Sequence, residues 1–105
     1  MSDGWSHGEK KLARRVFEEA LGAELSEVMA EFRARAASIA EPDDMWQLED
    51  YLREKRIGIE RKYDYRYSQL IWVFGNLLRE GRIQEAQLTG LSEEKLDSIR
   101  RIATF

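Results

Sequence analysis

Few side chains in this 105-residue sequence are suited to acid–base, nucleophilic or metal chemistry. His7 is the only histidine and there is no cysteine, so a Cys-based metal site and a thiolate nucleophile are excluded. His7 falls in the first turn of a predicted helix, where a solvated side chain is a better interpretation than a metal ligand. The sequence has no Glu-x-x-His pair and no glycine-rich phosphate-binding motif. We therefore expect a protein without enzyme activity, cofactor or metal.

Carboxylates gather at the start of a second predicted helix. Asp43 or Asp44 can cap this helix, and both suit the positive end of its dipole. Glu49 and Asp50 follow Trp46 by three and four positions, which places all three on one helix face. This arrangement predicts a partly exposed patch around Trp46. Packing of Trp46 in a dimer core is an equally acceptable interpretation.

Basic and aromatic residues alternate with acids between positions 53 and 67. The stretch contains Arg53, Lys55, Arg56, Arg61, Lys62, Arg66, Tyr63, Tyr65 and Tyr67. Arginine, tyrosine and tryptophan are enriched at binding hot spots, so a protein-binding surface is our preferred interpretation. A nucleic-acid surface is less favoured because the formal net charge is −3. A helix face with salt bridges at i and i+4 explains several of the charges.

The positions of apolar residues predict the elements that carry these groups. A first long helix is expected over about 6–40, because Ser6 and Glu9 form a capping-box pattern and Pro42 disfavours helix in the residue before it. A second long helix is expected over about 43–80, with Gly58 as the candidate point for a bend and Gly81 as the stop. A small head then spans 82–105, with its last helix beginning at Ser92.

This pattern predicts an all-α fold in a single domain, residues 1–105. The polar first ten residues do not resemble a signal peptide, and no apolar run is long enough to span a membrane. We therefore expect a cytoplasmic protein. Trp72 falls off the apolar stripe of its predicted helix, so it is a candidate contact residue in the head.

The length of the first helix predicts an elongated homodimer. A helix of about 34 residues is about 50 Å long, whereas a compact domain of this size has a radius of gyration of about 13 Å. Its apolar stripe would face water unless a second copy covers it, and symmetric dimers are the commonest solution. The alternative is a first helix broken at Gly22 and folded into a monomeric bundle.

The order of residues in the second half of the sequence resembles the fluorescence recovery protein family of cyanobacteria. The match is dense between positions 43 and 81 and thin from Gln87 to Leu91. It is carried by Asp43 to Leu48, Asp50 to Leu52, Lys55, Arg56, Ile59, Lys62 to Asp64, Arg66, Ser68, Val73, Phe74, Leu77, Leu78, Glu80 and Gly81.

The resemblance implies a helical dimer that binds the red, photoactivated orange carotenoid protein through that protein's C-terminal domain. It implies faster return to the orange form, release from the phycobilisome and an end to photoprotective quenching. The implied location is the cytoplasm, peripheral to the thylakoid membrane. The matching positions of the partner-binding patch are Trp46, Asp50 and Arg56, together with Trp72 in the head.

The resemblance also implies that Met29 and Met45 hold the dimer together. We expect Phe32, Leu48 and Leu52, which lie on the same apolar stripes, to contribute to this interface. Glu49, inside the partner-binding patch, replaces a histidine found in the family, and Ser98 replaces a lysine. Because charge complementarity governs specificity, the alternative is a family-like dimer that serves another protein in a host without the carotenoid protein.

Overall fold

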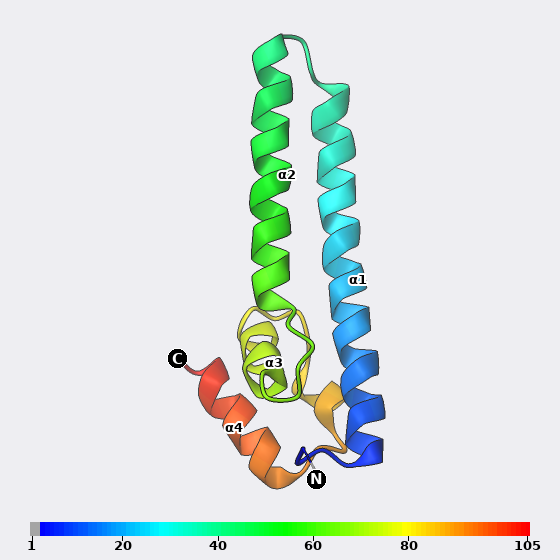
Figure 1. Ribbon diagram of the computed structural model, residues 1–105, viewed down its shortest axis with the longest axis vertical. Coiled ribbons are helices and arrows are strands. Elements are labelled where there is room, and N and C mark those ends of the chain that lie inside the picture. The colour runs from blue at the N-terminus through cyan, green and yellow to red at the C-terminus, as the bar shows by residue number, and fades with distance from the viewer. Residues whose placement is uncertain (1–2) are drawn as a thin grey trace.

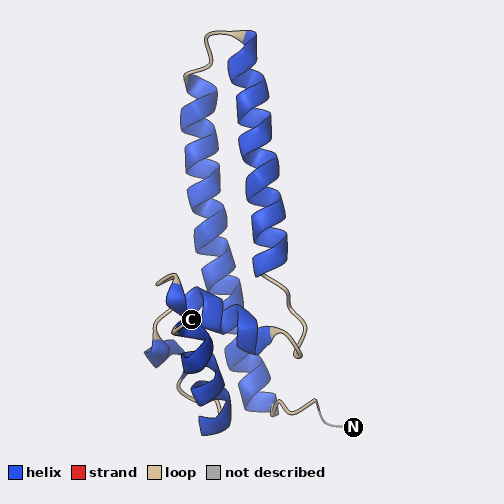
Figure 2. Cartoon of the chain, turned by 90° about the vertical axis from the view of Figure 1, so that its left-hand side faces the viewer, coloured by secondary structure: helices blue, strands red, loops and turns tan. Residues whose placement is uncertain are grey.

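The computed structural model describes residues 3–105, which form four α-helices and one short 3-10 helix. These are α1 (His7–Ala37), α2 (Pro42–Lys62), α3 (Leu70–Arg79), η1 (Glu85–Leu88) and α4 (Glu93–Ala103), and none of the described residues forms a strand. Figures 1 and 2 show α1 and α2 side by side as an antiparallel hairpin, with α3, η1 and α4 gathered at one end. The principal-axis extents are 54 × 28 × 21 Å, so the chain is elongated.

Helix α1 begins as the sequence predicts and ends slightly earlier. The Glu9 backbone N–H donates to Ser6 Oγ over 3.1 Å, and the Ser6 N–H donates to Glu9 Oε1 over 2.9 Å, which confirms the capping box. The helix continues unbroken through Gly22, so the alternative of a break at that residue is wrong. It ends at Ala37, and the Ser38 hydroxyl bonds the Ala34 carbonyl oxygen.

The start of α2 differs from the prediction. Its N-cap is Glu41 and Pro42 occupies the first helical position, where the missing proline N–H costs nothing. Asp44 reaches back to accept the N–H groups of Ala40 and Glu41, both at 3.0 Å. Asp44 therefore stabilises the helix start from inside the first turn, while neither Asp43 nor Asp44 is the cap itself.

A single second helix over 43–80 is wrong, because α2 ends at Lys62 and α3 begins at Leu70. Helix α2 passes through Gly58 without a break, and the chain changes direction at Tyr63 instead. Tyr63, Tyr65 and Tyr67 alternate with polar residues in a segment that is not helical, where the Arg66 N–H donates to the Asp64 carbonyl oxygen over 3.0 Å. Phe17 packs edge-on against Tyr63 and Tyr65, with ring centroids 5.5 and 4.8 Å apart. In a continuous helix Tyr63 and Tyr65 would point about 200° apart, so the two rings could not both pack against Phe17.

The buried core lies at one end of the molecule. Helices α3 and α4 pack closely, and a Cβ atom on Gly75 would lie 2.6 Å from Ile102 Cβ, so glycine is required at this contact. Gly81 has φ of +75° and ends α3, and the Ser92 hydroxyl caps α4, as predicted. We call residues 3–20 and 63–105 the head and residues 21–62 the arm. The head is larger than the predicted 82–105, because the start of α1 and all of α3 contribute to it.

Candidate functional site

Large apolar side chains are exposed along the arm. Met29 is 53% exposed and Met45 is 45% exposed, and Leu48 is the only buried residue of α2. The other exposed large apolar residues of the arm are Leu25, Phe32, Ile39, Trp46, Leu52 and Ile57. A surface of this kind marks a site of interaction with another macromolecule.

A groove runs between α1 and α2 on this exposed side. One hollow of about 290 Å³ is lined by Val28, Met29, Phe32, Arg33 and Leu52. A second hollow of about 400 Å³ is lined by Leu25, Val28, Leu52, Lys55, Arg56, Ile59 and Glu60. Because both hollows contain Val28 and Leu52, they form one continuous surface, which we call the arm groove.

Predicted dimer residues divide into two groups. Met29, Phe32 and Leu52 line the arm groove, and Met45 is exposed nearer the turn between the helices. Leu48 is buried within its own chain, so its apolar surface is already removed from water. The arm groove thus brings together three of the five predicted residues.

The charged residues of the predicted partner patch lie on exposed faces of α2. Arg56 Nε contacts Glu60 Oε1 at 3.0 Å, and Arg53 contacts Glu49 at 3.1 Å and Asp50 at 3.9 Å. The Arg56 side chain is 79% exposed. Exposed pairs of this kind contribute little stability, so these charges remain available to a partner.

Trp46 and Trp72 lie toward opposite ends of the elongated molecule, Trp46 in the arm and Trp72 in the head. Trp46 is 58% exposed in the first turns of α2, and Trp72 is 52% exposed on α3 in the head. The 16 residues that follow Trp46 in α2 correspond to about 24 Å of helix. A single chain therefore does not combine the two tryptophans in one local site, and a partner contacting both must span the length of the arm.

A polar cluster that the sequence did not predict lies at the junction of arm and head. Glu24 accepts from Lys62 Nζ at 2.8 Å and from the Tyr63 hydroxyl at 2.8 Å, and Arg82 Nε lies 3.0 Å from the same carboxylate. Lys62 also contacts Glu80 at 2.9 Å. Residues so distant in the sequence leave no periodic signal, so helix periodicity could not predict this cluster.

Burial and charge act against each other in this cluster. Burial by itself raises the pKa of Glu24, but hydrogen bonds from Lys62 and Tyr63 and the nearby Arg82 charge bring that pKa below its ordinary value. Burial, followed by the Glu24 hydrogen bond, raises the pKa of Tyr63. Glu24 is therefore held as a carboxylate and Tyr63 as a hydroxyl donor, which fixes the arm to the head.

A compact helical head and an arm with an exposed apolar groove define a small all-helical protein of the class that offers a surface to other proteins. The chain belongs to the family described as photoprotection regulator fluorescence recovery protein, whose model matches residues 5–103. The resemblance predicted from the sequence and the all-α fold class are both confirmed.

Similar proteins support the same assignment along nearly the whole chain. The fluorescence recovery protein of Synechocystis is 40% identical over 99 residues, which cover 94% of this chain and 91% of the relative. Its solved structure covers 96% of this chain and 99% of its own, with a TM-score of 0.91. The Fremyella diplosiphon fluorescence recovery protein is 35% identical, with the same two coverages and a TM-score of 0.91. None of the described helices has the length and apolar character needed to cross a membrane.

Proposed function

We propose that this chain is a non-enzymatic regulator that binds the red form of the orange carotenoid protein, through that protein's C-terminal domain, and accelerates its return to the orange form. The observation that carries the proposal is membership of the fluorescence recovery protein family over residues 5–103. The exposure of Trp46, Arg56 and Trp72 supports it, because a partner can reach all three.

The proposed mechanism is differential binding. A regulator speeds the closure of its partner only if it binds the transition state for closure more tightly than the open red form. Arg56 and Asp50 would supply charge complementarity, and Trp46 and Trp72 would supply apolar anchors. Because the two tryptophans lie far apart in one chain, this arrangement suits a partner with two domains that must be brought together.

We further propose that the working unit is a homodimer paired through the hollow of the arm groove that Met29, Phe32 and Leu52 line, with Arg56, in the neighbouring hollow, at the edge of the interface. The groove exposes Met29, Phe32 and Leu52, whose burial would stabilise association. Leu52→Glu should give a monomer, because a carboxylate would have to be buried without a partner. Ile57→Glu is the matched control, because Ile57 is 43% exposed on the same helix but does not line the groove.

Light scattering at micromolar concentration measures this outcome directly. We expect a dimeric mass for the unmodified chain and Ile57→Glu, and a monomeric mass for Leu52→Glu. A well-folded monomer before any substitution would contradict the proposed dimer.

Arg56→Leu tests the proposed role of the patch. It should slow recovery of the orange form in the dark about tenfold, the effect of losing about 1.4 kcal/mol of transition-state binding, while the dimer stays intact. Arg61→Leu is the control, because Arg61 is an exposed residue of α2 outside the arm groove. An unchanged recovery rate in Arg56→Leu would remove this residue from the mechanism.

A family-like dimer with a different protein partner is the second candidate. It is favoured by Glu49, which lies 3.1 Å from Arg53, and by Ser98, which accepts from Arg101 at 3.2 Å. Both residues stand where the family resemblance leads us to expect nitrogen-bearing side chains, so the surface offers less positive charge to the partner. Absence of any acceleration by an intact dimer of the unmodified chain would favour this candidate.

A further inference from the structure

A cationic surface covers the first turns of α1, in the head. His7, Lys11 and Arg15 are spaced by four residues and form one row along the helix, and Lys10 and Arg14 form a second row beside it. Residues four apart lie above one another at a rise of about 6 Å, so each row presents its charges along a line. This surface was not singled out by the sequence pattern, and the proposed function does not use it.

The row formed by Lys10 and Arg14 is held by contacts within the chain. The Arg14 guanidinium lies 4.0 Å from the Tyr65 ring centroid, and Lys10 Nζ lies 5.0 Å from the Tyr67 ring centroid. Arg14 also contacts Glu18 at 3.5 Å and Lys10 contacts Asp3 at 3.0 Å. Lys10 and Arg14 are therefore held over the rings of Tyr67 and Tyr65.

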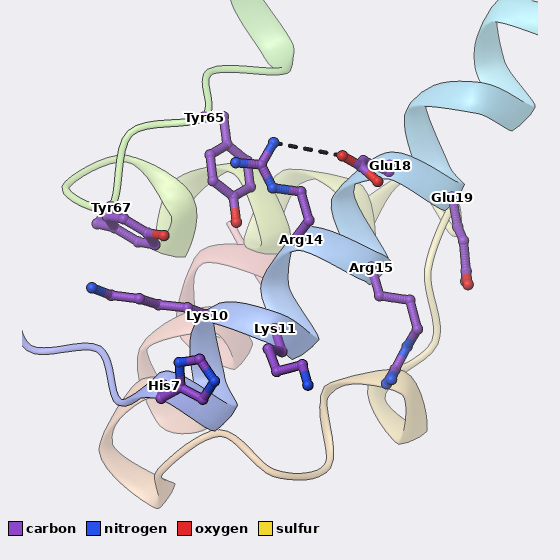
Figure 3. A pocket seen from close by; sticks show the side chains of 9 residues that line it. All are labelled: His7, Lys10, Lys11, Arg14, Arg15, Glu18, Glu19, Tyr65 and Tyr67. Carbon is purple, nitrogen blue, oxygen red and sulfur yellow. Dashed lines mark ion pairs between the residues drawn. The ribbon is translucent and has the colours of Figure 1, made fainter.

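The other row is open to solvent. Lys11 and Arg15 extend from one side of α1 and away from the tyrosines, with His7 below them (Figure 3). All three are exposed, and within residues 3–105 the side chains of Lys11 and Arg15 have no ion pair or hydrogen bond. Their charges are available to a ligand at no cost in internal contacts.

The two rows, the tyrosines Tyr65 and Tyr67, and Glu18 and Glu19 line a shallow, open hollow of about 490 Å³. Its lining carries four formal positive charges against two negative charges, in a chain whose formal net charge is −3. The local excess of positive charge is therefore opposite in sign to the molecule as a whole, which favours an anionic partner at this surface.

We propose that this surface binds an extended acidic segment of a partner polypeptide. The row from His7 to Arg15 is about 12 Å long, which matches about four residues of an extended chain at 3.3 Å each. Carboxylates on one side of such a segment would pair with Lys11 and Arg15, and an apolar side chain on the other side would pack against Tyr67.

A polypeptide fits this surface better than a nucleic acid does. Glu18 and Glu19 lie in the same hollow and Asp3 lies beside Lys10, so a backbone with a charge at every unit would meet repulsion. A peptide can place its carboxylates only where the cations are. The site does not depend on the arm groove, because Arg15 and Val28 are separated by about 20 Å along α1. An acidic segment can therefore bind while the groove is occupied.

The test measures the fluorescence anisotropy of a short labelled peptide in which glutamates alternate with glycines around one phenylalanine. We expect saturable binding at about 0.01 M salt and strong weakening at about 0.15 M, as the Debye length falls from about 30 to 8 Å. The double variant Lys11→Gln/Arg15→Gln should bind about tenfold more weakly. Both residues are exposed, so its circular dichroism spectrum and melting temperature should match those of the unmodified chain.

The matched control is Arg61→Gln/Arg101→Gln, which removes the same two charges from exposed positions outside the hollow. Its affinity should stay within about twofold of the unmodified chain, as should its fold. Equal weakening in both double variants would overturn the proposal, because it would show general attraction without a site. The proposal would also be overturned by equal binding of a peptide with lysines in place of glutamates, or by tighter binding of single-stranded DNA at this face.

Discussion

The head and the arm are both built from helices, but the head buries most of its large apolar side chains and the arm exposes most of its own. In the head, the start of α1 packs with α3, η1 and α4, and almost every large apolar side chain is buried. In the arm, the rest of α1 faces α2, and Leu48 is the only buried residue between positions 21 and 62. Eight of the ten exposed large apolar residues belong to the arm, and only Trp72 and Phe105 belong to the head.

This difference assigns most of the folding free energy to the head and the exposed binding surface to the arm. The free energy of folding comes mainly from the head, because stabilisation follows the apolar area that is removed from water. The arm extends an apolar groove whose area is removed from water only when another polypeptide binds. One continuous helix, α1, serves both purposes and holds the two regions in a fixed relation.

Alanine at matched phenylalanines gives the largest expected contrast. Phe74→Ala should lower the free energy of unfolding by about 3–5 kcal/mol, because Phe74 is fully buried and the head cannot collapse around the cavity. Phe32→Ala should cost less, about 1–2 kcal/mol in the single chain, because Phe32 is 36% exposed and lies at the surface of the arm. Urea denaturation at concentrations too low for the proposed dimer to form measures both losses. Similar losses in the two variants would contradict the assignment of the folding free energy to the head.

Acid should weaken the head through one buried carboxylate, Glu9. Glu9 is buried and accepts from the N–H groups of Ser6 and Ser92, each at 2.9 Å, and from Lys95 at 3.2 Å. The Ser6 hydrogen bond, opposed by burial and helped by Ser92 and Lys95, lowers the pKa of Glu9 below its ordinary value of 4.5.

Because that pKa is lowered on folding, Glu9 contributes stability above pH 4.5, and this contribution is lost as the pH falls through the lower value of the folded state. Glu9→Gln should reduce stability near neutral pH by about 1–2 kcal/mol and flatten the acid limb of the stability–pH profile. Urea denaturation across this pH range measures both effects. Glu54→Gln, an exposed carboxylate of the arm, should leave the profile unchanged, and the same flattening in that variant would contradict the assignment.

Local signals in the sequence predicted the ends of the elements better than their number. The capping box at Ser6 and Glu9, the glycine stop at Gly81 and the cap at Ser92 are all short-range chemistry, and all three occur in the structure. The break between α2 and α3 was missed because Tyr63 continues the apolar stripe at helical spacing. Tertiary packing of the tyrosines on Phe17 overrides that local preference.

The candidate site was predictable to a different extent. Phe32 and Leu52 were found from the apolar stripes because the arm groove follows the helix axis, whereas Met29 came from the family resemblance. The partner patch came from the family resemblance, which a single helix pattern cannot supply. Neither route indicates the contacts of Glu24 with Lys62 and Arg82, since only the fold brings these positions together.

The smallest expected effect is that of alanine at two glycines of the arm, which tests whether another molecule lies against the arm. Gly22 and Gly58 are exposed helical residues, and a Cβ atom at either position would meet no atom within 4 Å. In an isolated chain, alanine at each position should raise the free energy of unfolding by about 0.5–1 kcal/mol, because alanine restricts the unfolded chain and favours helix. Melting temperatures of both variants, measured at concentrations above and below that at which the proposed dimer forms, test this prediction. A gain at both positions in the monomer, with a loss at one of them at concentrations where the proposed dimer forms, would identify the side of the arm that a second copy covers. A loss at either position in the monomer would contradict the open surroundings of the arm.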